Sequence, residues 1–263
     1  MGIEKFVECN GIKIAYDTDR EIDPAQTYLL FLHGLQTNKE GFNALRQDLL
    51  NNLSFPHLAI DLVGFGHSDK PQNFSYDLAD QTAILIKILN ALHLQKVHVV
   101  GHSLGGMIGT LLLKELPNHI QSLCSMEGNL KLDDCGESKI IASMSFDYFK
   151  NHYFKTLKTN LENSNQPNKY IRLGALNPVP DFVFYQTGQS IVTWANTNQL
   201  FDTFMQTHQP KILLRGEKGN FSTLPTGPTI ENVIIANAGH FVHLDNPVET
   251  SNAIINFLSK INK

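Results

Sequence analysis

Short apolar runs open the chain and predict a hairpin followed by a buried strand. Residues 3–8 and 12–16 have β-type sequences, and Asn10-Gly11 between them is typical of a two-residue type I′ turn. Residues 27–32 are almost entirely apolar, as expected of a strand covered on both faces. The pattern therefore predicts a sheet that begins with a hairpin and contains residues 27–32 as a strand buried on both faces.

From residue 40 to residue 126 segments of helical periodicity alternate with short apolar runs. We expect helices at 40–50, 76–92 and 104–116, and strands at 58–62, 96–100 and 120–126. Strand–helix alternation favours a mostly parallel sheet with helices on both faces. The predicted fold class is therefore α/β.

The alternation stops after residue 126 and resumes near residue 208. Residues 128–207 carry helical patterns without a convincing strand, whereas 211–214 and 232–236 again resemble strands. A last helix is expected at 247–261, where Pro247 suits the first turn. We therefore predict a core domain formed by residues 1–127 and 208–263, interrupted by a helical cap at 128–207.

Composition narrows the classes of function. Hydrophobic residues make up 42% of the chain and charged residues 17%, which is typical of a folded domain, and the net charge of −4 gives no indication of a nucleic-acid partner. No apolar run approaches the roughly 20 residues that span a bilayer, so no stable membrane insertion is expected. Three cysteines form no disulfide framework, and the start of the chain lacks a signal-peptide pattern. We expect a cytoplasmic protein.

The sequence GHSLGG at residues 101–106 is the strongest chemical signal. It lies where a predicted strand runs directly into a predicted helix, which is the context of a G-x-S-x-G nucleophile elbow. Ser103 would occupy a tight, strained turn, and Gly101 and Gly105 would remove side chains that collide with the neighbouring strand and helix. We expect Ser103 to be a nucleophile, rather than an ordinary serine in a glycine-rich turn.

Acyl transfer also needs backbone N–H donors for the developing oxyanion. Leu104 follows the nucleophile and would supply one donor. The sequence HGL at 33–35 follows the buried strand 27–32, and we assign the second donor to Leu35. His33 precedes the donor position and is expected to be structural.

A base for Ser103 is expected near the end of the chain. His240 follows the last predicted strand in a loop of small residues and precedes the last helix, so it is the predicted base. His243, three residues further on, is the rival base, and it is expected to pack against the sheet or a loop.

In combination, the motifs HG at 33–34, DLVGFGHS at 61–68, GHSLGG at 101–106 and AGH at 238–240 resemble the α/β-hydrolase superfamily over nearly the whole chain. The resemblance implies an eight-stranded, mostly parallel sheet with a helical cap over the site. The loop at 61–68 resembles the one after the family's fourth strand, and it is expected to be structural.

The sequence position of the acid in the expected triad differs from the one that is usual in the superfamily. In most members it follows the seventh strand in a pattern like G-x-x-D, but the matching position here is Gly219. Some members, notably those resembling haloalkane dehalogenases, carry the acid after the sixth strand, where this chain has Glu127, 24 residues after Ser103. We expect Glu127 to orient His240. Glu217, two residues before the usual position, stays open as the alternative, as does a triad that works without an acid.

The cap is rich in aromatic residues and its charges balance. Half of the chain's aromatic residues fall within residues 146–204. We expect an apolar cavity roof, with Phe146, Phe149 and Trp194 binding substrate, although such residues could simply pack a small cap.

These expectations define a serine hydrolase that cleaves a small to medium, apolar carboxylic ester through an acyl-enzyme. The mechanism needs no metal and no cofactor, and the expected partner is the small-molecule ester itself. Two alternatives stay open: a carbon–carbon bond hydrolase or related lyase with the same triad, and a weakly catalytic ligand sensor on the same fold.

Overall fold

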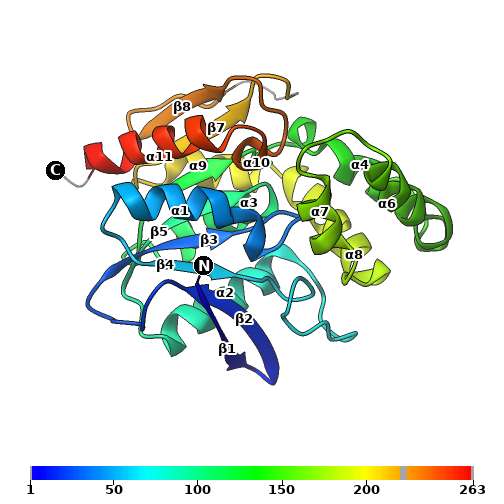
Figure 1. Ribbon diagram of the computed structural model, residues 1–263, viewed down its shortest axis with the longest axis horizontal. Coiled ribbons are helices and arrows are strands. Elements are labelled where there is room, and N and C mark those ends of the chain that lie inside the picture. Colours follow the sequence, from blue (N-terminus) through cyan, green and yellow to red (C-terminus); the bar gives the residue numbers. More distant parts are fainter. Residues whose placement is uncertain (1, 220–223, 262–263) are drawn as a thin grey trace.

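The strands form one sheet in the order β1-β2-β4-β3-β5-β6-β7-β8 (Figure 1). The computed structural model describes residues 2–219 and 224–261. The strands span Ile3–Cys9 (β1), Ile12–Thr18 (β2), Thr27–Leu32 (β3), His57–Ile60 (β4), Lys96–His102 (β5), Ile120–Met126 (β6), Lys211–Gly216 (β7) and Ile230–Ile235 (β8). Within these described ranges β2 pairs antiparallel with β1 and β4, and the other neighbouring pairs are parallel. The predicted α/β fold with an eight-stranded, mostly parallel sheet is confirmed.

The opening hairpin forms as its sequence predicts. Cys9 pairs with Ile12 across a two-residue turn, and both turn residues have positive φ, 56° at Asn10 and 73° at Gly11. Positive φ at both positions is the requirement of a type I′ turn, which asparagine and glycine meet at little cost.

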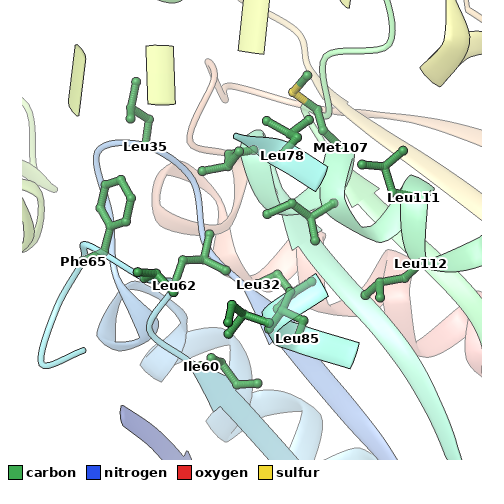
Figure 2. Packing of buried hydrophobic residues seen from close by; sticks show 14 of the residues in the cluster. Leu32, Leu35, Ile60, Leu62, Phe65, Leu78, Leu85, Met107, Leu111 and Leu112 are labelled. Carbon is green, nitrogen blue, oxygen red and sulfur yellow. The ribbon is translucent and has the colours of Figure 1, made fainter. Parts of the chain in front are cut away.

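Alternate residues of the central strand β3 face two separate hydrophobic clusters. Leu30 and Leu32 pack on the face covered by α2 and α3, whereas Leu29 and Phe31 pack on the face covered by α1 and α11. Figure 2 shows the first cluster, in which side chains of β3 and β4 meet those of α2 and α3. Because both faces are covered, β3 is apolar at nearly every position.

Helices occupy the segments between strands. They span Asn43–Asn52 (α1), Leu78–Ala91 (α2), Leu104–Glu115 (α3), Gly136–Ala142 (α4), Phe146–Tyr148 (α5), Phe154–Glu162 (α6), Lys169–Leu176 (α7), Asp181–Ala195 (α8), Gln199–Gln206 (α9), Val242–Asp245 (α10) and Pro247–Ile261 (α11), with short turns at Lys39–Phe42 (η1), Leu132–Asp134 (η2) and Phe149–Tyr153 (η3). The helix expected at 40–50 is divided into η1 and α1. The helix expected at 76–92 begins later because Asp77 caps α2, accepting from the Ala79 N–H at 2.8 Å.

Residues 127–210, all of which the structure describes, form helices and connecting turns between β6 and β7. Figure 1 shows α4, α6, α7 and α8 grouped at one end of the molecule. We call residues 128–207 the cap, and their division from the core stays a prediction. No helix in the described ranges has the length and apolar character needed to cross a membrane.

Three buried histidines make the fold sensitive to acid. Burial lowers the pKa of His57 and His243 to about 3 and that of His98 to about 4. The unfolded chain binds protons at these rings near pH 6.5, whereas the folded chain does not, so stability is highest above that pH and falls as the pH drops below it. We expect each ring to lower the free energy of unfolding by about 2 kcal/mol at pH 5 relative to pH 8.

Urea unfolding at pH 8 and pH 5 measures this loss. The variant His57→Gln should lose less stability between the two pH values than the wild type, whatever its absolute stability. His208→Gln, at an exposed ring, is the matched control. Equal pH dependence in wild type and His57→Gln would contradict the assignment.

Candidate active site

Ser103 is the single residue between β5 and α3. Its backbone has φ 50° and ψ −113°, a combination that residues other than glycine rarely adopt and that costs on the order of 1–3 kcal/mol. The Ser103 N–H donates to the Met126 carbonyl at 2.8 Å, and its own carbonyl accepts from the Gly106 N–H at 2.9 Å. These bonds hold the turn in its strained form, with the serine at the wall of a cavity.

The elbow depends on two glycines because the backbones there are too close for a side chain. A Cβ at Gly101 would lie 2.4 Å from the Gly105 carbonyl oxygen. A Cβ at Gly105 would lie 1.9 Å from the Leu32 carbonyl oxygen of β3. The steric reason for the G-x-S-x-G spacing is therefore visible in this chain.

Two backbone N–H groups beside the serine are without acceptors. In residues 2–219 and 224–261, neither the Leu35 N–H nor the Leu104 N–H donates to another group. Leu104 begins α3, where the first helical N–H groups have no partner within the helix. The loop carrying Leu35 passes close to Ser103, since a Cβ at Gly34 would lie 3.1 Å from the Ser103 Cβ. Both groups are free to bind an oxyanion.

His33 holds the base of that loop. Its Nδ1 lies 2.8 Å from the Gly34 carbonyl, and its Nε2 accepts from the Leu62 N–H at 3.0 Å. The ring is fully buried, and burial lowers its pKa, so it is neutral with the proton on Nδ1. This arrangement fits the structural role expected for His33.

His240 lies in the loop between β8 and α10 and faces the same cavity as Ser103. Its Nδ1 lies 3.6 Å from Glu127 Oε2, and its side chain is 42% exposed. The structure thus brings Ser103, His240 and Glu127 to one cavity from three separate segments.

Glu127 directly follows β6 and has a positive φ of 53°. Its Oε1 accepts from the Gly216 N–H at 2.6 Å, and Arg215 Nη1 lies 3.3 Å from Oε2. Arg215 Nη2 in turn lies 3.4 Å from Asp134 Oδ2. The carboxylate is buried, and these donors fix its orientation beside His240.

The empty acid position lies next to Glu127. A Cβ at Gly219 would be 3.4 Å from Glu127 Oε1, so a longer side chain from residue 219 would reach the place where this carboxylate lies. The alternative acid, Glu217, is exposed and accepts from the Asn237 N–H at 2.9 Å. Geometry therefore brings Glu127, and not Glu217, to His240.

His102 supports the loop that carries His240. Its Nε2 donates to the His240 carbonyl at 2.8 Å, and its ring centroid lies 4.5 Å from that of His243. Burial lowers the pKa of His102, so the ring is neutral. His243 is buried against His102 and Phe42, in agreement with the packing role expected for it.

A cavity of about 460 Å³ opens over Ser103. Its walls are lined by Leu35, Gln36, His102, Ser103, Glu127, Asn129, Asp133, Asp134, Cys135, Gly136, Glu137, Ser138, Lys139, Arg172, Lys218, Gly219, His240 and Phe241. Most of these residues are polar or charged. Carbon atoms nevertheless form much of the cavity surface, so the expected apolar roof stays a prediction.

The three aromatic residues expected to bind substrate lie away from its walls. Phe149 is fully buried and stacks on Phe154 at 5.3 Å, and Phe146 packs against Tyr185 at 5.2 Å. Trp194 Nε1 donates to the Asp77 carboxylate at 3.1 Å, and its ring lies by another pocket. Phe146 and Phe149 pack against other cap rings, whereas Trp194 bonds to the residue that caps α2. None of the three lines the cavity over Ser103, and their binding of substrate stays a prediction. Aromatic content does not tell which face a ring occupies.

Several charged or polar residues of the site were not predicted from the sequence, among them Gln36, Glu137, Arg172 and Arg215. Of these four only Arg215 had a signal, because it is a charged residue at the end of an apolar strand that proves to be buried. Within the ranges that the structure describes, no group of three His, Cys, Asp or Glu side chains is placed to hold a metal ion.

Comparison with known families assigns the class. The family model described as the alpha/beta hydrolase fold matches residues 27–165, more than half of the chain. The chain therefore belongs to the α/β-hydrolase family.

Known relatives include lipases. The chain is 24% identical over 287 aligned residues to the sn-1-specific diacylglycerol lipase ABHD11 of Danio rerio, covering 98% of this chain and 86% of that protein. It is 32% identical over 125 residues to Lipase 1 of Psychrobacter immobilis, covering 47% of this chain and 38% of that one.

Solved structures share the fold at low identity. A carboxylesterase of Nitrososphaera gargenis superposes with a TM-score of 0.80 at 15% identity, over 98% of this chain and 99% of that chain. Est816, an N-acyl homoserine lactone degrading enzyme, gives 0.74 at 22% identity, over 96% of this chain and 100% of that chain. At this identity the likeness concerns the fold alone.

Proposed function

We propose that the protein is a serine hydrolase that cleaves carboxylic esters through an acyl-enzyme. The observation that carries the proposal is the approach of His240 Nδ1 to Glu127 Oε2, 3.6 Å, at the cavity lined by Ser103. A serine beside a histidine that is itself oriented by a buried carboxylate forms the catalytic triad that activates a hydroxyl nucleophile.

The first half of the reaction acylates the serine. His240 Nε2 takes the Ser103 proton as the oxygen attacks the ester carbonyl, and Glu127 stabilises the imidazolium that forms. The carbonyl electron pair moves onto oxygen, where the Leu35 and Leu104 N–H groups would bind it. When the tetrahedral intermediate collapses, the bond to the alcohol oxygen breaks and His240 protonates the leaving alcohol.

The second half releases the acid. His240 removes a proton from a water molecule that attacks the acyl carbonyl, and the same two N–H groups bind the second oxyanion. Collapse breaks the bond to Ser103 Oγ, which recovers its proton from His240, and the carboxylic acid leaves.

The cavity favours a small to medium ester with hydrogen-bonding groups. About 460 Å³ lies within the range of small-molecule sites. Charged side chains such as Lys139 and Lys218 lie in its walls and could donate to hydrogen-bonding groups of a substrate. Lipases among the relatives support the choice of an ester bond.

A panel of esters tests this prediction. Purified wild-type protein should be labelled by a fluorophosphonate and should turn over p-nitrophenyl acetate and butyrate. Among alkyl esters of one length, those carrying a hydroxyl or amide should give the higher kcat/KM, measured by proton release. Preference for unsubstituted alkyl esters would contradict the substrate assignment, and a protein that is neither labelled nor active would contradict the enzyme itself.

A carbon–carbon bond hydrolase is the second candidate, because the polar cavity also suits a substrate with an enolate or carboxylate. Its signature would be fluorophosphonate labelling without turnover of any ester. Turnover of the p-nitrophenyl esters by the wild type, and its loss in the variant Ser103→Ala, would favour the esterase.

A further inference from the structure

The tip of the loop that carries Leu35 has almost no hydrogen bonds of its own. In the described ranges, the backbone N–H and carbonyl groups of Leu35 and Gln36 make none. The Thr37 N–H closes the turn around them by donating to the Gly34 carbonyl at 3.3 Å. On either side of this turn, His33 bonds to Leu62 and the Lys39 N–H donates to Asp61 Oδ1 at 2.9 Å. The N–H proposed to bind the oxyanion therefore sits on the least anchored part of the loop.

The Gln36 side chain supplies the missing polar anchor, and both of its partners come from the cap. Arg172 Nη2 on α7 donates to Gln36 Oε1, and Gln36 Nε2 donates to Glu137 Oε2 on α4. Glu137 is further held by the Tyr153 hydroxyl, which donates to its Oε1 at 3.3 Å. The amide thus bridges two charged side chains that form no direct ion pair within 4 Å.

This bridge has a single workable orientation. A guanidinium can only donate and a carboxylate only accept, so the amide oxygen must face Arg172 and the amide nitrogen must face Glu137. Gln36 and Arg172 are each only 7% exposed, which shields the bonds from water. Bonds to charged groups in such surroundings are stronger than bonds between neutral groups.

Arg172 also touches the loop of the proposed base. Its guanidinium lies 4.2 Å from the centroid of the Phe241 ring, next to His240. One cap side chain therefore contacts both loops that the proposed reaction uses, and its Nη1 donates to Gln166 Oε1 within the cap at 2.5 Å.

We propose that Gln36 is a positioning residue through which the cap, by means of Arg172 and Glu137, holds the Leu35 N–H where the oxyanion forms. This inference rests on the proposed ester hydrolysis. It makes the cap part of the oxyanion site and not only a cover over the substrate.

Replacing Gln36 by leucine should lower the rate of the chemical step. Gln36→Leu keeps the approximate size of the side chain but removes both hydrogen bonds. We expect kcat to fall about 10- to 100-fold, as for misplacement of a catalytic group by about 1 Å, while KM changes less than about threefold. The affinity for a trifluoromethyl ketone, which forms a tetrahedral adduct, should fall by the same factor as kcat. Gln47→Leu, on the exposed face of α1, is the matched control and should behave as wild type.

An exchange of the charges provides the sharper test. Gln36→Glu alone places two carboxylates in contact and should lower kcat at least as much as Gln36→Leu. Adding Glu137→Gln restores every bond, because the amide at 137 can donate to the carboxylate at 36, which still accepts from Arg172. We expect the double variant to recover kcat to within about threefold of wild type.

Three results would overturn the inference: wild-type kcat in Gln36→Leu, a change confined to KM, or a double variant no better than Gln36→Glu. Failure of ester hydrolysis itself is recognised separately, as a wild type without turnover or labelling. In that case hydrogen–deuterium exchange of residues 33–42 still decides the coupling. Faster exchange in Gln36→Leu than in Gln47→Leu supports the anchor, and equal exchange refutes it.

Discussion

Ser103→Ala is expected to lower kcat for p-nitrophenyl esters about 10⁵- to 10⁶-fold and to abolish fluorophosphonate labelling. The reason is that Ser103 supplies the only protein atom that becomes bonded to the acyl group in the proposed reaction. Initial rates with p-nitrophenyl butyrate, together with gel detection of the probe, measure both effects. Activity above about 1% of wild type would contradict the assignment of the nucleophile.

Two variants separate this effect from damage to the fold. Ser125→Ala removes a buried hydroxyl of β6 whose oxygen has no hydrogen-bond partner in the described ranges, and it should leave the rate unchanged. Ser103→Gly should be as inactive as Ser103→Ala but more stable than wild type by about 1 kcal/mol, because glycine adopts a positive φ without strain. Urea unfolding measures that gain.

Removal of the acid should have the next largest effect. Glu127→Gln is expected to lower kcat about 10³- to 10⁴-fold while leaving KM nearly unchanged, because an amide can neither stabilise the imidazolium nor enforce its tautomer. Glu217→Gln is the matched control at an exposed carboxylate and should retain wild-type kcat. Equal losses in the two variants would contradict the assignment of Glu127.

Because Gly219 lies next to the Glu127 carboxylate, we expect that the acid of the proposed triad can be supplied from residue 219 instead of residue 127. Because a Cβ there would lie 3.4 Å from Glu127 Oε1, an aspartate at 219 could reach His240 once the glutamate side chain is gone. We expect Glu127→Ala/Gly219→Asp to exceed Glu127→Ala by about 10- to 100-fold in kcat. Gly219→Asp alone should be slower than wild type, because two carboxylates would crowd one site. A double variant as slow as Glu127→Ala would show that the two positions are not interchangeable.

The chain pattern predicts most of the fold because each core strand is a short apolar run bounded by turn residues. The observed boundaries of helices and strands differ from the predicted ones where the hydrogen bonds of a side chain end an element. The strand expected to continue to residue 62 stops at Ile60, since the Asp61 side chain accepts from the Lys39 and His67 N–H groups. Helix α2 starts late for the same kind of reason, at the Asp77 cap.

The candidate site was predictable only where local sequence carries the chemistry. Ser103 is marked by glycines that the elbow requires, and Glu127 by its place at the end of a strand next to β5. Gln36, Glu137 and Arg172 meet from three segments with no local signature, and a single sequence does not reveal such meetings. The contacts of the aromatic cap residues were not predictable either, because composition records that rings are present but not what they contact.

Two of the three proposed triad residues have backbone conformations that favour glycine, φ 50° at Ser103 and φ 53° at Glu127. They end neighbouring parallel strands, so the sheet presents both side chains through turns that oppose its own stability. At residue 103 selection for stability alone would favour glycine, whereas at residue 127 the buried contacts of the carboxylate with Arg215 and the Gly216 N–H oppose that replacement. Persistence of the serine in descendants of the chain would therefore record selection for chemistry, whereas glycine at residue 103 would mark a lineage that had lost it.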